Sequence, residues 1–212
     1  MKKSVYLFLA FLILLILFIP NILTRAESQV IYLDPGHGGF DGGCVGNGLI
    51  EKDITLNITL KLKRHLESSG YVVYLTREVD KALSNEKAND IYKRVALINN
   101  ANTLIYISIH ANSYPHESVK GAQTFYKQSE NNKKLAELIQ QSLQQIDLKN
   151  HRFAKSITGK YLLEHTNKTG CLVEVGFLSN TSELELMLTD EFRDSFAKGI
   201  ANGIIKAHSK IK

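Results

Sequence analysis

The chain has 212 residues, of which 44% are hydrophobic and 22% are charged, and glycine and proline are not in excess. This length suits one catalytic domain with a short extra segment, and the composition is typical of a globular protein rather than a disordered one. The formal net charge is +5, but Lys2, Lys3 and Arg25 lie in or beside the N-terminal segment, and without them it is about +2. No basic run with interleaved aromatic residues is present, so we expect no nucleic-acid partner.

Residues 1–25 predict an export segment. Lys2 and Lys3 precede a continuous apolar run at residues 5–19. The run is long for a signal peptide and slightly short for a membrane-spanning helix of about 20 residues. The positive flank orients the rest of the chain outward. We expect either a retained apolar helix, which anchors the protein at the outer face of the cytoplasmic membrane, or a signal segment cleaved near Ala26, which leaves a secreted protein.

From residue 29 the chain alternates short apolar stretches with amphipathic ones. The short stretches predict strands at residues 30–33, 71–75, 104–109, 122–126 and 171–175. Apolar residues at helical spacing predict helices at residues 51–67, 85–99, 133–146 and 191–208. This alternation predicts one α/β domain at residues 29–210, with a largely parallel sheet covered by helices on both faces.

Cys44 and Cys171 do not have the spacing of a zinc ribbon. We expect two separate thiols in or near the core. A disulfide stays open as an alternative in an exported protein, because it depends on Cα distances that a sequence does not contain.

Two histidines and one glutamate occupy positions at which a parallel sheet gathers functional residues. His37 follows the first predicted strand, His110 follows the strand at residues 104–109, and Glu51 begins a helix. Residues beyond the carboxyl ends of neighbouring parallel strands meet in one crevice. Two imidazoles and one carboxylate form a catalytic zinc set with a fourth position for water or substrate. Taken singly, each histidine also fits a solvated residue, and Glu51 fits a favourable charge at a helix start.

Glu174 is a carboxylate inside an apolar predicted strand. An unpaired carboxylate buried there would cost several kcal/mol. The side chain must therefore meet a cation, reach water at the sheet edge or have a raised pKa. A metal crevice meets all these conditions and would make Glu174 a general base. A structural ion pair with a buried arginine or lysine is the alternative.

Four sequence blocks resemble the signature of the zinc-dependent N-acetylmuramoyl-L-alanine amidases of the amidase-3 type. The blocks are Leu33-Asp34-Pro35-Gly36-His37-Gly38-Gly39, Glu51-Lys52-Asp53, Ser108-Ile109-His110-Ala111-Asn112 and Val173-Glu174-Val175-Gly176-Phe177-Leu178-Ser179-Asn180. The likeness extends over residues 30–207, which is nearly the whole domain. One departure is Thr169, since family members often have a proline a few residues before the catalytic glutamate.

The resemblance implies an α/β fold with a mixed, mainly parallel sheet flanked by helices on both faces. It implies that His37, Glu51 and His110 bind one Zn²⁺ per chain and that Glu174 is catalytic. The implied reaction is hydrolysis of the amide bond between N-acetylmuramic acid and L-alanine of the peptidoglycan stem peptide.

The absence of wall-binding repeats narrows the resemblance to the short spore-cortex amidases, which act in germination. Only residues 113–120 separate the third block's end from the next predicted strand, so an inhibitory helix of the kind that some relatives carry there is not expected. The narrower resemblance implies an exported enzyme of the spore cortex, and it leaves open an exported protein activator. Two rival functions are a degenerate wall-binding module and a zinc carboxypeptidase, and the intact blocks argue against both.

Overall fold

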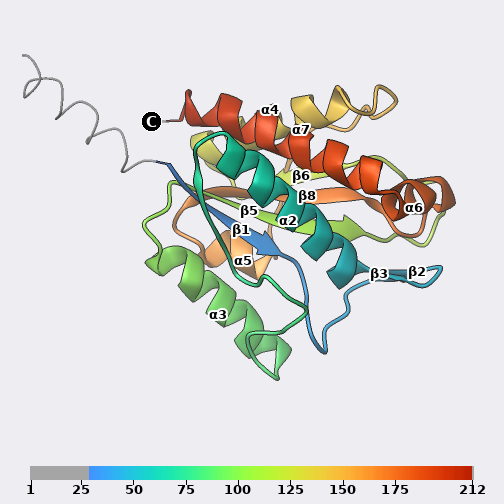
Figure 1. Ribbon diagram of the computed structural model, residues 1–212, viewed down its shortest axis with the longest axis horizontal. Helices are drawn as coiled ribbons and strands as arrows, with labels where there is room; N and C mark the ends of the chain where they lie inside the picture. The colour runs from blue at the N-terminus through green and yellow to red at the C-terminus, as the bar shows by residue number, and fades with distance from the viewer. Residues whose placement is uncertain (1–28, 212) are drawn as a thin grey trace, which may run out of the picture.

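A computed structural model describes residues 29–211 of the chain. This part forms three layers, with a six-stranded sheet between two layers of helices (Figure 1). The sheet has the order β4-β1-β5-β8-β6-β7. Its strands are β1 (Val30–Pro35), β4 (Val72–Leu75), β5 (Ile105–Asn112), β6 (Gln123–Tyr126), β7 (Lys155–Ser156) and β8 (Thr169–Phe177).

The sheet is mixed and mainly parallel, as predicted. Strands β4, β1, β5 and β8 run parallel, β6 is antiparallel to β8, and β7 is parallel to β6. The central strands are apolar on both sides because helices cover both faces. In β1, for example, Ile31 and Leu33 join the larger core cluster, whereas Tyr32 joins the smaller cluster on the opposite face.

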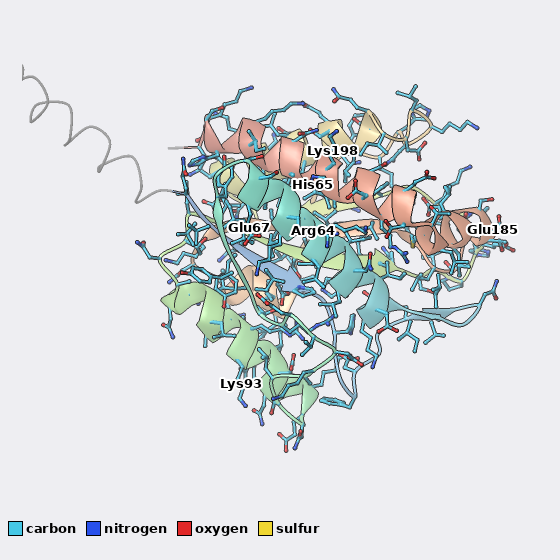
Figure 2. All side chains as sticks on the ribbon, viewed as in Figure 1. Arg64, His65, Glu67, Lys93, Glu185 and Lys198 are labelled. Atoms are coloured by element: carbon cyan, nitrogen blue, oxygen red, sulfur yellow. The ribbon has the colours of Figure 1, made fainter. Side chains whose placement is uncertain are left out.

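Helices α2, α4 and α7 cover one face of the sheet, and α3 and α5 cover the other (Figure 1). A short hairpin, β2–β3, precedes α2, and α6 precedes α7. Figure 2 shows the labelled charged residues Arg64, Lys93 and Lys198 on these helices, and all three are exposed. The bounds are β2 (Val45–Gly46), β3 (Leu49–Ile50), α2 (Glu51–Ser68), α3 (Lys87–Asn100), α4 (Glu130–Gln144), α5 (Tyr161–His165), α6 (Thr181–Leu188) and α7 (Asp190–His208).

One predicted boundary was wrong in a way that matters for function. His110 does not follow its strand but lies inside β5, which continues to Asn112. The backbone of His110 still pairs in register with that of Glu174 in β8, and the register shifts only between His110 and Asn112.

The sequence patterns missed several short elements, namely the β2–β3 hairpin, β7, α5 and α6. Two-residue strands and helices of five to eight residues are too short to show a clear period.

Residues 113–120 contain no helix, as expected. Cys44 and Cys171 are free thiols. Among residues 29–211, no helix has both the length and the apolar character needed to cross a membrane. The expected apolar helix at residues 1–25 lies outside the described residues.

Helix α7 crosses α4 at a glycine that allows close contact between the two backbones. A Cβ atom added at Gly203 would lie 2.5 Å from the Cα atom of Ile139. A Cβ atom added at Gly199 in the same helix would overlap the tip of the Ile146 side chain and would otherwise meet Leu143 Cδ2 at an ordinary 3.4 Å. Ile146 is 38% exposed and can turn aside, whereas the α4 backbone cannot.

We therefore expect opposite behaviour from two alanine substitutions in α7. Gly203→Ala should lower the free energy of unfolding by about 1–3 kcal/mol, because the two helices must separate. The control, Gly199→Ala, should leave the free energy of unfolding within about 1 kcal/mol of the wild-type value. Alanine stabilises a helix by about that amount relative to glycine, and this gain offsets the cost of moving the Ile146 side chain. Urea unfolding followed by circular dichroism measures both. Equal effects would contradict the close backbone contact.

Candidate active site

The three candidate ligands converge at one end of the sheet. His37 lies in the loop after β1, Glu51 is the first residue of α2, and His110 comes from β5. Their candidate ligand atoms all lie within 4.8 Å of one another. Glu51 Oε1 is 3.2 Å from His37 Nε2 and 3.0 Å from His110 Nδ1. The structure thus brings together, from three separate segments, the residues that the sequence patterns selected.

Glu51 is a buried carboxylate that remains ionised. It is 3% exposed, and its two oxygens accept hydrogen bonds from the backbone amides of Cys44 and Ala111. Burial alone would raise its pKa, but hydrogen bonds and charge from His110 and His37 hold the pKa well below its usual range. The cluster therefore has an anionic centre that favours a bound cation.

His37 is oriented by a second carboxylate. Its Nδ1 atom lies 2.9 Å from Asp41 Oδ2, which leaves Nε2 to face Glu51. Burial lowers the pKa of His37, and this effect is outweighed by the contacts with Glu51 and Asp41, which raise it. A carboxylate on the outer nitrogen of a metal-binding histidine fixes the tautomer and the ring orientation. Asp41 was not selected from the sequence, although its position four residues after His37 could have indicated it.

Glycines let the loops approach the ligands closely. A Cβ atom at Gly43 would lie 2.5 Å from Glu51 Oε2 and 2.7 Å from His37 Cδ2. A Cβ atom at Gly36 would lie 2.4 Å from His110 Cε1. Gly43 also has a φ angle of 71°, which favours glycine. These positions are tightly packed around the cluster, so any other side chain would displace a ligand.

A buried ion pair holds the backbone next to His37. Asp34 accepts hydrogen bonds from Arg94, Thr76 and Ser108, and Arg94 also donates to the carbonyl oxygen of His37. Burial opposes ionisation of Asp34, but Arg94 and the two hydroxyl groups hold the pKa of its carboxyl below the usual value. This network joins β1, β5 and α3 beneath the loop that presents His37.

Glu174 faces the same pocket from β8. It pairs in register with His110, it is 7% exposed, and its Oε2 atom has no hydrogen-bond partner among the described residues. Burial raises its pKa. The structural ion pair considered as an alternative is not present among residues 29–211. A pocket of about 520 Å³ is lined by Glu174 together with His37, Glu51 and His110.

The donor set fits a zinc ion. Zinc in catalytic sites binds nitrogen atoms of histidine and oxygen atoms of carboxylates, with one position left for water or substrate. The cluster supplies two ring nitrogens and one ionised carboxylate, and the adjacent Glu174 leaves an unpartnered oxygen facing the pocket. The site can therefore combine a Lewis acid with a base whose pKa is raised, which is the requirement for hydrolysis of an amide.

This fold and this cluster of two histidines and one glutamate, which could hold a metal ion, point to a hydrolase. Residues 31–206 match the model of the N-acetylmuramoyl-L-alanine amidase family, and the chain belongs to that family. The predicted family, fold class and amidase activity are thereby confirmed.

Relatives of known name and structure agree with this assignment. The chain is 43% identical to the germination-specific N-acetylmuramoyl-L-alanine amidase of Bacillus subtilis (strain 168), over 85% of this chain and 80% of the relative. It is 31% identical to the sporulation-specific N-acetylmuramoyl-L-alanine amidase of the same organism, over 84% and 67% respectively. The solved CwlD amidase from Clostridioides difficile, in complex with the GerS lipoprotein, matches with a TM-score of 0.83 at 38% identity, over 86% of this chain and all of that one.

Proposed function

We propose that this amidase is zinc-dependent, with His37, Glu51 and His110 as ligands of one Zn²⁺ per chain and Glu174 as the catalytic acid and base. The observation that carries the proposal is the convergence of two histidine nitrogens on a buried, ionised Glu51, with an unpartnered carboxylate oxygen of Glu174 in the same pocket. The substrate is the amide bond between N-acetylmuramic acid and L-alanine in peptidoglycan.

The proposed roles divide the chemistry between the metal and the chain. When bound, zinc supplies a Lewis acid that polarises the scissile carbonyl and lowers the pKa of a water molecule. Glu174 accepts a proton from the attacking water as the new C–O bond forms. It then donates this proton to the leaving nitrogen as the C–N bond breaks. Because burial raises its pKa, Glu174 both takes up and releases the proton, so one carboxylate serves both steps.

The first prediction from this proposal concerns the metal. The purified protein should contain about one zinc per chain. His110→Ala should lose zinc and activity together, because the two remaining ligands, Glu51 and His37, are too few to hold the ion. His151→Ala is the matched control, since His151 is exposed and does not line this pocket. Inductively coupled plasma mass spectrometry gives the metal content. An unchanged zinc content in the single alanine variants of His37, Glu51 and His110 would contradict their assignment as zinc ligands.

The second prediction separates proton transfer from ligation. Glu174→Gln should keep the fold and near-normal zinc but lose a factor of roughly 10² to 10⁴ in rate. The reason is that the glutamine side chain cannot accept the proton of the attacking water or pass it to the leaving nitrogen. The rate is measured by mass spectrometry, as amino groups of L-alanine freed from peptidoglycan. Loss of zinc in this variant would make Glu174 a ligand, and full activity would move the general base elsewhere.

The same digest decides between the amidase and its two rivals. Freed L-alanine amino groups report cleavage by an amidase. Loss of a terminal D-alanine from the stem would instead report a carboxypeptidase. Peptidoglycan that is bound but chemically unchanged would report a binding module.

We further propose that the chain acts on spore-cortex peptidoglycan after export directed by residues 1–25. The germination-specific and sporulation-specific relatives support the cortex as the place of action. The lysine pair and apolar run support export, with the segment either retained as a membrane anchor or cleaved. The complex of the CwlD amidase with a lipoprotein supports an exported protein partner for this chain as well.

Removal of residues 1–25 tests the export proposal. The shortened protein should fold and cleave peptidoglycan in vitro, because its site lies within residues 29–211. Produced in a sporulating cell that lacks the full-length chain, it should leave the cortex stem peptides uncut, because it stays in the compartment where it is made. Mass spectrometry of the cortex measures this. Cortex cleavage equal to that of the full-length chain would show that the segment is not needed for export.

A further inference from the structure

A lysine that the proposed chemistry does not use lies in the catalytic pocket. Besides Glu174 and the candidate zinc ligands, the pocket of about 520 Å³ is lined by two lysines, Lys87 and Lys160. Lys87 Nζ is 3.2 Å from Asp41 Oδ2 and is therefore paired. Lys160 forms no ion pair or side-chain hydrogen bond within residues 29–211. The pocket thus has one cation available to a bound molecule.

The backbone of Lys160 is held in place although its side chain is exposed. Lys160 directly precedes α5, and its carbonyl oxygen accepts a hydrogen bond from the amide of Glu164. The Glu164 carboxylate accepts a hydrogen bond from the amide of Gly159, which closes the turn on the other side. Leu162 and Leu163 of α5 are buried in the smaller core cluster. A cation on a fixed stem loses less freedom on binding than one on a mobile loop.

Lys160 is not the counter-ion of the catalytic carboxylate. Both residues line the pocket, but no ion pair joins them, and Glu174 Oε2 remains without a hydrogen-bond partner. The positive charge of Lys160 does act on Glu174 at longer range, where it opposes the rise in pKa that burial causes. The ammonium group is therefore free to bind another anion.

A second pocket adjoins the first at the candidate zinc ligands. It has a volume of about 420 Å³ and shares His37, Asp41, Lys87 and His110 with the first pocket. Both of its cations are already paired, Arg94 with Asp34 and Asp90, and Lys87 with Asp41. A substrate that crosses the zinc ligands would therefore meet an available cation only on the side of Glu174 and Lys160.

We propose that Lys160 is a specificity residue that binds the free carboxylate of the stem peptide next to the scissile bond. The inference rests on the proposed amidase chemistry, and it adds the orientation in which the peptide and the glycan bind across the site. The glycan strand is neutral around the scissile bond. The stem peptide is acidic, because the residue after L-alanine is joined through its side-chain carboxyl and keeps its α-carboxylate. The peptide thus lies on the side of Lys160, and the glycan lies on the side of the second pocket.

Two soluble muropeptides that differ only in this α-carboxyl test the inference, one with the free carboxylate and one with its amide. The full-length wild-type chain should prefer the carboxylate substrate. Lys160→Gln should raise KM for that substrate roughly two- to fivefold, the range for an ion pair at an exposed site, with kcat nearly unchanged. KM for the amide substrate should not change. Lys160→Arg should keep the preference, and Lys149→Gln, the same charge change at an exposed site outside the pocket, should have no effect.

Binding measurements keep this inference separate from the proposed catalytic roles. Calorimetric titration in the Glu174→Gln background compares both muropeptides without turnover, and adding Lys160→Gln should abolish the preference for the carboxylate. A preference that survives Lys160→Gln would overturn the inference. So would an equal fall in kcat for both substrates, because Lys160 would then act on the chemical step or on the fold. Cleavage of neither substrate by the wild type would contradict the proposed function, while the titration would still test Lys160.

Discussion

The active site depends on one buried charge, the carboxylate of Glu51 at the first turn of α2. An ionised carboxylate that is 3% exposed has to be compensated on several sides. Backbone amides from the β2 region and from β5 meet its two oxygens, and His37 and His110 meet the oxygen that faces the pocket. The same contacts that make burial of the charge tolerable therefore assemble the ligand set. In this protein, the contacts that stabilise the buried carboxylate of Glu51 are also the contacts that favour a bound cation.

The close packing of the loops follows from that requirement. Glu51 comes from a helix, His110 from a strand and His37 from a loop, so three backbones must approach one carboxylate. Glycines at positions 36 and 43 make the approach possible, because a side chain at either place would overlap a ligand. The Asp34–Arg94 pair then holds the loop from below, where no water reaches it. Glycines and a buried ion pair thus fix the position of His37 in its loop, as strand β5 fixes the position of His110.

The division of labour between the two buried carboxylates also follows from their surroundings. Glu51 accepts hydrogen bonds and faces two imidazoles, so it stays charged and suits ligation. Glu174 has one oxygen without a partner and sits in an apolar strand, so its pKa is raised and it suits proton transfer. We therefore propose different roles for two residues of the same type, because one is solvated by the protein and the other is not.

The sequence alone determined the class of fold, the family and the four residues proposed for ligation and catalysis. Strands and helices of the core have apolar periods that are set by burial. His37 and His110 stand at predicted strand ends, Glu51 begins a helix and Glu174 lies in an apolar run. The four signature blocks around them single out these positions together. Short elements such as α5 and the β2–β3 hairpin carry no such period and could not be predicted.

Only the tertiary structure decided how the site is completed. The register of β5 against β8 puts His110 inside the strand and opposite Glu174, and a one-residue difference in that register has no signature in either strand. Asp41 and Lys160 reach the pocket through contacts between segments that are distant in the chain or irregular in conformation. Local sequence records what a residue is and which period it follows. The cavity that its side chain enters depends on how separate segments pack, and that is a property of the whole fold.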